Sequence, residues 1–147
     1  MYKLKIPPPS EKQKRFFVSK ARFVGYGGAR GGGKSWAMRT KLVLLCFRYA
    51  GLKCLLLRRT LPELKENHLN PLLALLGDSV NYKASERVFE FPNGSYLKLG
   101  YCDREADVYH YQGQTPNILP PLTVTFCSLT RVTRCICTTI PARLAWI

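Results

Sequence analysis

Acidic residues are scarce in this sequence, and long apolar runs are missing. Nine Asp and Glu stand against 23 Lys and Arg, which gives a formal net charge of +14 on 147 residues. Such an imbalance favours a polyanionic partner, and nucleic acid is a better explanation than a surface that is basic only for solubility. No apolar run approaches the ~20 residues of a membrane span, and residues 1–9 have no apolar signal core. We therefore expect a cytoplasmic protein with no membrane partner.

Cysteine pairs with the spacing of a common zinc site are also missing. The sequence has no Cys-x-x-Cys motif, and Cys127, Cys135 and Cys137 form a poor zinc set because no His or further Cys lies near them in sequence. We expect free buried thiols instead of disulfides or a metal centre. The six cysteines are Cys46, Cys54, Cys102, Cys127, Cys135 and Cys137.

A glycine-rich stretch matches the pattern Gly, four residues, Gly-Lys-Ser/Thr, which is typical of a phosphate-binding P-loop. A triphosphate is bound by backbone N–H groups, so side chains must be absent where the backbone wraps around it. Lys34 would then reach the β- and γ-phosphates of ATP, and the Ser35 hydroxyl would bind Mg²⁺. The predicted loop residues are Gly28, Ala29, Arg30, Gly31, Gly32, Gly33, Lys34 and Ser35.

The segments around this loop have the context that a P-loop requires. Residues 22–26 form a short apolar run that predicts a strand, and residues 34–49 predict a helix that stops at Gly51. Residues 53–57 form a continuous apolar run, as expected of a parallel strand buried on both faces. The order strand, loop, helix, strand predicts an α/β fold built on one right-handed βαβ unit.

Two arginines follow the second predicted strand, at the edge where α/β proteins bind ligands. After Arg58 and Arg59, the capping-box spacing of Thr60 and Glu63 predicts a helix that begins near Leu61. This helix should run at least to His68 and break or restart at the Asn70-Pro71 pair. We interpret His68 as a surface or semi-buried residue and not as a ligand.

The hydrophobic period changes to two between Val80 and Tyr101. Residues 87–91 and 95–99 alternate around Pro92-Asn93-Gly94, which is a strong hairpin signal. Two antiparallel strands should therefore lie beside the parallel unit. Residues 103–111 form a short polar segment that we expect to be helical.

Residues 1–21 carry six basic side chains, one acid and three consecutive prolines. Because a proline run cannot join a helix or a central strand, we expect an extended basic arm packed on or near the core. Its charges suit a contact with a phosphate backbone, and they equally suit a solvated leader.

Four motifs occur in order along the chain: residues 26–35, residues 57–64, Phe91-Pro92-Asn93-Gly94-Ser95 and Tyr111-Gln112-Gly113. Together they resemble the large terminase subunit of tailed bacteriophages over about residues 20–114. The resemblance implies a RecA-like P-loop NTPase of the strand-catalytic-glutamate type, which packages viral DNA using ATP and Mg²⁺. It also implies double-stranded DNA, the small terminase subunit and the portal protein as partners, and a nuclease domain that follows the ATPase domain.

Two further site residues come from this resemblance. Arg30 resembles an arginine that many terminases place within the loop, where it senses or stabilises the γ-phosphate in the manner of an arginine finger. Tyr26 lies just before the loop, where the adenine could stack on it, and a core aromatic residue is an equal alternative.

The resemblance ends at about residue 113. The family pattern continues there with a buried strand that ends in Asp-Glu, the Walker B acids for Mg²⁺ coordination and water activation. Here no Asp or Glu occurs from Val108 onward, and residues 114–147 hold three cysteines and seven threonines but no lysine. We therefore expect a basic arm (1–21), a partial ATPase domain (22–113) and an atypical tail (114–147) that is an out-of-frame or truncated product. The alternative is a genuine tail with strands at residues 122–126 and 132–140.

The sequence is compatible with three functions. The first is an ATP-binding terminase fragment that does not hydrolyse ATP by itself, because the Walker B acids are missing. The second is a small P-loop kinase or other NTPase unrelated to packaging, for which Asp103, Glu105 and Asp107 are the late acidic candidates. The third is a basic, non-enzymatic DNA-binding protein.

The frameshift hypothesis predicts what the gene encodes next. One of the other two reading frames downstream of codon 114 should encode an apolar run that ends in Asp-Glu. Sequencing this DNA tests the prediction directly. The absence of such a run from both frames would exclude a simple frameshift.

Overall fold

The computed structural model describes residues 6–19, 23–27, 31–104, 107, 111, 123–127 and 144–146. It shows a mixed α/β fold with a five-stranded sheet of order β3-β4-β5-β2-β6 and a separate β1-β7 pair. Strand β2 runs parallel to both β5 and β6, whereas β4 runs antiparallel to β3 and β5. The strands are β1 (Phe23–Gly25), β2 (Lys53–Arg58), β3 (Asn81–Lys83), β4 (Val88–Glu90), β5 (Tyr96–Tyr101), β6 (Thr123–Cys127) and β7 (Leu144–Trp146).

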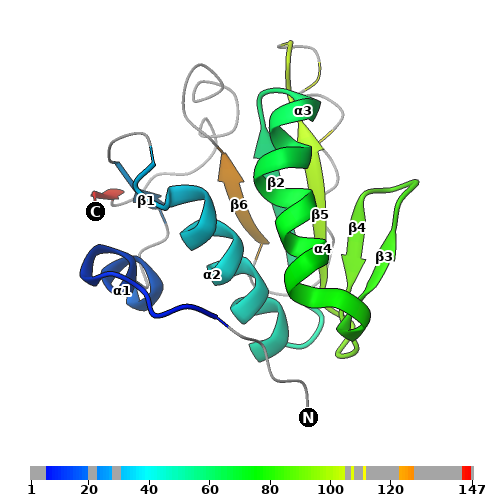
Figure 1. Cartoon of the computed structure of the whole chain (residues 1–147), viewed down its shortest axis with the longest axis horizontal. Coiled ribbons are helices and arrows are strands. Elements are labelled where there is room, and N and C mark those ends of the chain that lie inside the picture. The colour runs from blue at the N-terminus through cyan, green and yellow to red at the C-terminus, as the bar shows by residue number, and fades with distance from the viewer. Residues whose placement is uncertain are drawn as a thin grey trace.

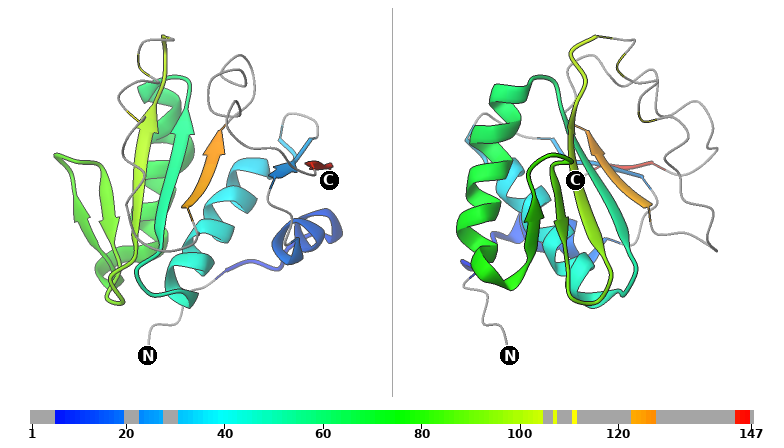
Figure 2. Two further views of the ribbon diagram at one scale, coloured as in Figure 1. Left: turned by 180° about the vertical axis from the view of Figure 1, so that it is seen from behind. Right: turned by 90° about the vertical axis from the view of Figure 1, so that its right-hand side faces the viewer.

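Helices α2 and α4 lie on the same face of the five-stranded sheet, and α1 lies beside α2 near the β1-β7 pair (Figures 1 and 2). Between the sheet and these helices, leucines from α2, β2, β5 and α4 form the core together with Phe89. The helical segments are α1 (Glu11–Val18), α2 (Lys34–Arg48), α3 (Leu61–Leu64), the π-helical η1 (Lys65–Leu69), α4 (Asn70–Leu76) and the 3₁₀ turn η2 (Gly77–Ser79).

The predicted centre of the fold is confirmed. Helix α2 covers all but one residue of the predicted segment, and the second strand and the antiparallel hairpin form where the patterns place them. Strand β1 pairs with β7 and not with β2, so the two strands of the βαβ unit belong to different sheets. Gly51 follows the helix in a turn with φ +71°, a left-handed conformation that suits glycine.

The expected extended arm is wrong for residues 11–18, which form α1. Ser10 and Gln13 make a capping box, in which Ser10 N–H donates to Gln13 Oε1 at 2.8 Å and Gln13 N–H donates to Ser10 Oγ at 3.4 Å. The prolines end one residue before this N-cap and do not interrupt the helix. Phe16 is buried, and the basic residues Lys14 and Arg15 are exposed.

The expected restart at Asn70-Pro71 is confirmed, because α4 begins at Asn70 directly after η1, and α3, η1 and α4 follow one another without a break. Pro71 has no N–H, so it cannot donate to the carbonyl of Asn67 as an α-helical residue would. The chain widens into a π-turn here, and the Arg39 guanidinium from α2 donates to the Asn67 carbonyl. Arg39 of the neighbouring helix α2 thus replaces the N–H donor that Pro71 lacks.

The hairpin turn between β4 and β5 caps the C-terminal end of α2. Asn93 Nδ2 donates to the Cys46 carbonyl at 2.7 Å, and Ser95 Oγ donates to the Tyr49 carbonyl at 2.5 Å. The same Ser95 hydroxyl accepts the N–H of Leu52 at 3.1 Å. The last carbonyls of a helix have no partner within the helix, so this turn supplies donors that α2 lacks.

Tyr111, the first residue of the Tyr-Gln-Gly motif, packs against the end of β5. Its hydroxyl accepts the N–H of Tyr101 and donates to the carbonyl of the same residue, both at 3.3 Å. A Cβ atom at Gly100 would lie 2.6 Å from this hydroxyl and 2.7 Å from Leu57 Cδ2. Gly100 therefore permits the close approach of Tyr111, while Gln112 and Gly113 lie outside the described residues.

Residues from the tail contribute β6 and β7. Strand β6 coincides with the strand that the alternative of a genuine tail places at residues 122–126. The alternative's second strand, at 132–140, and most of the predicted 103–111 helix lie outside the described residues. Whether the tail is out of frame stays a prediction.

Two expectations concern cysteines and membranes. Cys46, Cys54 and Cys102 are buried thiols that form no disulfide, which confirms the expectation at these positions. In the part of the chain that the structure describes, no helix is both long enough and apolar enough to cross a membrane.

The α2 cap makes Asn93 a stability determinant. We expect Asn93→Ala to lower the free energy of unfolding by about 1–2 kcal/mol, because it removes a donor from partly buried helix carbonyls. Urea unfolding followed by circular dichroism measures this. Asn81→Ala is the matched control, since its amide donates to the exposed Glu90 carboxylate at 3.3 Å and not to a helix carbonyl. Equal losses in both variants would contradict the capping role.

Candidate phosphate-binding site

Residues 31–35 are the described part of the predicted P-loop, whereas Gly28, Ala29 and Arg30 lie outside the described residues. Gly31 and Gly33 have φ angles of +84° and +69°, a left-handed region that strains any residue with a side chain. A Cβ atom at Gly33 would also lie 2.6 Å from Gln13 Nε2. The backbone geometry thus explains the glycines at positions 31 and 33.

Helix α2 begins directly after this loop, at Lys34, with Gly33 as its N-cap. The first N–H groups of a helix have no acceptor within it, and the helix dipole makes this end positive. No acidic residue lies in the first turn of α2, and Lys34 adds a full positive charge. This end of α2 is therefore built to attract an anion.

The side chain of Arg58 connects this helix end to the sheet. Arg58 is the last residue of β2, and its Nη2 donates to Ser35 Oγ at 2.5 Å. Because β2, β5 and β6 are parallel, their carboxyl ends meet at the same edge of the sheet. The structure thus brings together Ser35 and Arg58, which belong to separate sequence motifs. The neighbouring Arg59 is exposed.

His68 from η1 completes this group, and its interpretation as a surface or semi-buried residue is wrong. Its side chain is fully buried, and its Nε2 accepts a hydrogen bond from Arg58 Nε at 2.6 Å. Burial, together with the charges of Arg58 and Arg39, lowers the pKa of His68 to about 3. A neutral ring that accepts at Nε2 carries its hydrogen on Nδ1, and Nδ1 has no partner among the described residues.

The burial of His68 had a signal in the sequence. Leu64 and Leu72 lie four residues to either side of it, and both are buried. Residues four apart lie on one face of a helix, so His68 occupies a position in the apolar stripe. Its partner Arg58 lies on another element, and no sequence spacing indicates that contact.

Arg39 is a second arginine that the sequence reasoning missed. It lies one helical turn after Ser35 and donates to the Asn67 carbonyl, next to His68. Burial lowers the pKa of Arg39, and the nearby charge of Arg58 lowers it further. Two arginines, Arg39 of α2 and Arg58 at the end of β2, therefore lie close to each other.

Helix α1 supports the loop from its other side. Gln13 Nε2 donates to the Gly33 carbonyl at 3.4 Å. The ring of Tyr26 lies 4.9 Å from that of Phe16 and 5.8 Å from Lys12 Nζ, and burial raises the pKa of its hydroxyl. The described contacts of Tyr26 are thus made with α1, and adenine stacking on this ring stays a prediction.

Metal ligands are few at this site. No group of three His, Cys, Asp or Glu that could hold a metal ion occurs among the described residues. Ser35 offers one hydroxyl oxygen, and that oxygen accepts a hydrogen bond from a cation. The loop and helix end therefore fit a phosphate well, whereas Mg²⁺ would depend on Ser35 and on oxygens of the nucleotide itself.

Acidic side chains are missing where the family pattern places them. Strand β6 ends at Cys127, which pairs with Leu57 of β2, and no Asp or Glu follows in the sequence. Asp107 Oδ2 accepts the N–H groups of Asp103 and Arg104 at 3.0 and 2.9 Å. Of the other acidic candidates, Asp103 is exposed and Glu105 lies outside the described residues.

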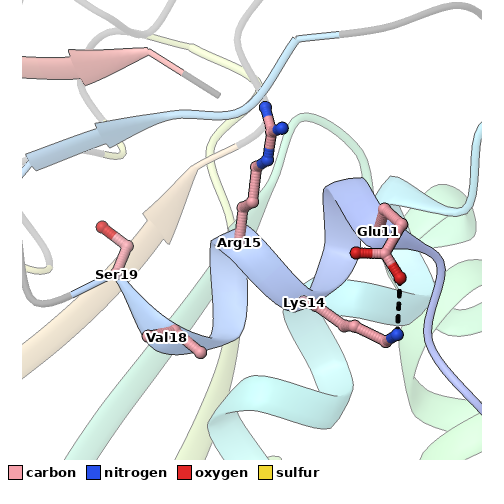
Figure 3. A pocket seen from close by; sticks show the side chains of 5 residues that line it. All are labelled: Glu11, Lys14, Arg15, Val18 and Ser19. Atoms are coloured by element: carbon pink, nitrogen blue, oxygen red, sulfur yellow. Dashed lines mark hydrogen bonds and ion pairs between the residues drawn. The ribbon is translucent and has the colours of Figure 1, made fainter.

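A shallow depression on the outer face of α1 is a separate feature (Figure 3). Glu11 and Lys14 point toward each other across one helical turn and form an ion pair at 2.5 Å, while Arg15 points away from them. Both members of the pair are largely exposed, so it contributes little. The residues that line the depression are Glu11, Lys14, Arg15, Val18 and Ser19, and none belongs to the P-loop.

Comparisons with known proteins support the fold. No protein-family model matches the sequence, and no curated protein matches it. The structure is similar to that of a large terminase from a thermophilic bacteriophage, which was solved in complex with ATP-γ-S. The TM-score is 0.60 at 16% sequence identity, and the match covers 82% of this chain. It covers 38% of the terminase chain, so the present chain spans well under half of that protein's length.

The lowered pKa of His68 predicts a pH-dependent stability. The folded state keeps His68 neutral down to about pH 3, whereas the unfolded state takes up a proton below about pH 6.5. Lowering the pH therefore favours unfolding, and we expect the free energy of unfolding to fall by about 1 kcal/mol from about pH 7 to about pH 5.5. Urea titrations at several pH values measure this loss.

His68→Gln is the control, because an amide oxygen can still accept from Arg58 but does not titrate. We expect a flatter pH dependence in this variant. The second histidine, His110, is present in both proteins and cancels from the comparison. Identical pH slopes would show that His68 is not buried as a neutral ring.

Proposed function

We propose that this chain is an ATP-binding domain of the terminase kind, with an incomplete RecA-like P-loop fold. The observation that carries the proposal is the position of Lys34 and Ser35. They begin α2 directly after a glycine loop, and Arg58 meets Ser35 at the carboxyl edge of the parallel strands. The terminase of similar fold was crystallised with ATP-γ-S, which agrees with a nucleotide at this edge.

Each residue of the loop has a role in this proposal. The backbone N–H groups from Gly28 to Gly33 surround the phosphates, and Lys34 contacts the β- and γ-phosphates. Ser35 contributes a ligand to Mg²⁺, which neutralises phosphate charge when it is bound. Arg30 contacts the γ-phosphate, and Tyr26 lies beside the base.

The strand arrangement supports the RecA-like assignment. Strand β7 pairs with β1, and β6 pairs with β2, all in parallel. Figures 1 and 2 place β6 between the β1-β7 pair and β2. Strand β6, which follows later in the chain, thus lies between the P-loop strand β1 and strand β2.

Binding without hydrolysis is the second part of the proposal. Attack of water on the γ-phosphate needs a group that orients and activates the water, and a carboxylate that completes Mg²⁺ coordination. Neither is supplied by residues 108–147, which contain no Asp or Glu. The chain then retains phosphate binding but loses the positioning and charge stabilisation on which turnover depends.

The proposed partners follow from the terminase assignment and from charge. They are double-stranded DNA, the small terminase subunit and the portal protein. The net charge of +14 favours DNA, and Lys12, Lys14 and Arg15 of α1 expose basic groups that suit its backbone. A purely DNA-binding protein is the rival function, and DNA binding that depends on salt but not on nucleotide would favour it.

Nucleotide binding without turnover is the test of this proposal. We expect the purified chain to bind a fluorescent ATP analogue in the presence of Mg²⁺, and Lys34→Ala to weaken this binding at least about tenfold, because it removes a charge-assisted contact to phosphate. Phosphate release should equal that of a blank without protein. Fluorescence titration and a phosphate-release assay measure the two quantities.

Lys83→Ala is the matched control, since Lys83 is an exposed lysine on β3 that pairs with Glu90 at 2.7 Å. It should bind the analogue as the unmodified chain does. Equal weakening in both variants would point to a nonspecific charge effect. Hydrolysis that Lys34→Ala abolishes would contradict the proposed inactivity.

A further inference from the structure

We propose that Arg58 contacts the terminal phosphate of bound ATP, and that His68 is the positioning residue that holds Arg58 for this contact. In the structure the Arg58 guanidinium donates to Ser35. With Mg²⁺-nucleotide in the loop, its Nη2 turns from Ser35 to an oxygen of the terminal phosphate. This inference rests on the proposed function and adds to it a residue that distinguishes a triphosphate from a diphosphate.

Mg²⁺ and Arg58 would compete for the same oxygen atom, Ser35 Oγ. Ser35 Oγ, the proposed Mg²⁺ ligand, accepts a hydrogen bond from Arg58 Nη2 at 2.5 Å. A divalent ion on the same oxygen would lie within a few ångströms of the guanidinium, and like charges at that distance repel strongly when partly shielded from water. Binding of Mg²⁺ to Ser35 therefore requires the Arg58 nitrogen to change its partner.

An oxygen of the terminal phosphate would be the new hydrogen-bond partner of Arg58 Nη2. If Mg²⁺ bound Ser35 Oγ together with oxygens of the terminal phosphate, those oxygens would lie near this hydroxyl. Arg58 Nη2 is already within hydrogen-bond distance of that hydroxyl and would need only a short movement. The planar, permanently charged guanidinium suits phosphate oxygens well.

His68 anchors the Arg58 side chain during this movement. Its Nε donates to His68 Nε2 at 2.6 Å, and His68 is completely buried. The next residue toward the N-terminus, Asn67, is held to α2 by Arg39. Arg58 can thus exchange one partner at Nη2 while its Nε stays on a fixed acceptor.

The neighbouring Arg59 provides the contrast. It has the same charge and is one residue further along the chain, but its side chain is exposed. A general electrostatic effect of the basic site would be lost equally from Arg58→Ala and Arg59→Ala. A direct phosphate contact would be lost from the Arg58 variant alone.

The experiment compares two nucleotides that differ at the terminal phosphate. Dissociation constants for ATP-γ-S and ADP are measured by isothermal titration calorimetry with Mg²⁺, on the full chain and on Lys34→Ala, Arg58→Ala and Arg59→Ala. We expect Arg58→Ala to weaken ATP-γ-S about tenfold and ADP less than about twofold, because one charge-assisted hydrogen bond is lost from the triphosphate only. Arg59→Ala should leave both constants unchanged.

His68 variants test the anchor separately. His68→Gln keeps an acceptor for Arg58 Nε and should retain the preference for ATP-γ-S over ADP. His68→Leu removes the acceptor and should lose much of that preference while binding ADP normally. If Arg58→Ala does not fold, as judged by circular dichroism, Arg58→Gln replaces it, because it keeps an amide donor for His68.

The outcomes separate this inference from the function on which it rests. Equal effects of Arg58→Ala on both nucleotides, or none on either, would overturn the phosphate contact while loss of binding in Lys34→Ala still supports the P-loop. Loss of preference in His68→Gln as well as in His68→Leu would overturn the anchoring role. Failure of the unmodified chain to bind either nucleotide would overturn both proposals.

Discussion

The guanidinium of Arg58 lies at the carboxyl end of β2, a partly buried strand, where its N–H groups need hydrogen-bond acceptors. Its two hydrogen bonds hold together the segments at this edge of the sheet. One acceptor belongs to the first turn of α2 and the other to the π-turn η1. The hydrogen bonds therefore join the sheet to both segments that cover it at this edge. Because the His68 side chain is fully buried, the loss of Arg58 would leave His68 Nε2 without this hydrogen bond.

Helix α2 is fixed at both ends by groups from the sheet. Arg58 meets Ser35 at its first turn, and the turn before β5 supplies Asn93 and Ser95 to its last carbonyls. Two of the motifs that resemble terminase thus have structural explanations. The Pro-Asn-Gly-Ser turn caps the P-loop helix, and Tyr111 packs over Gly100 at the end of β5. Neither role requires a nucleotide.

Much of the centre of the fold was predictable, because local patterns specify it. The glycine loop, the helix after it, the apolar strand β2 and the hairpin around Asn93 follow from spacing and turn chemistry alone. The proline run at residues 7–9 favours an extended arm, whereas the capping box at Ser10 and Gln13 is the local signal for helix α1. The π-turn and the contacts of Arg58 and Arg39 could not be predicted, since each joins elements that are distant in sequence and depends on tertiary packing. The pairing of β1 with β7 is of the same kind.

The proline at position 71 has a wider consequence. Since Pro71 cannot bond to the Asn67 carbonyl, the helix that covers the sheet takes its donor from Arg39, one turn after Ser35 on the P-loop helix. Asn67 adjoins His68, which in turn holds Arg58. The π-helical segment η1 therefore joins two helices that cover one face of the sheet, because its Asn67 carbonyl accepts a hydrogen bond from Arg39 of α2.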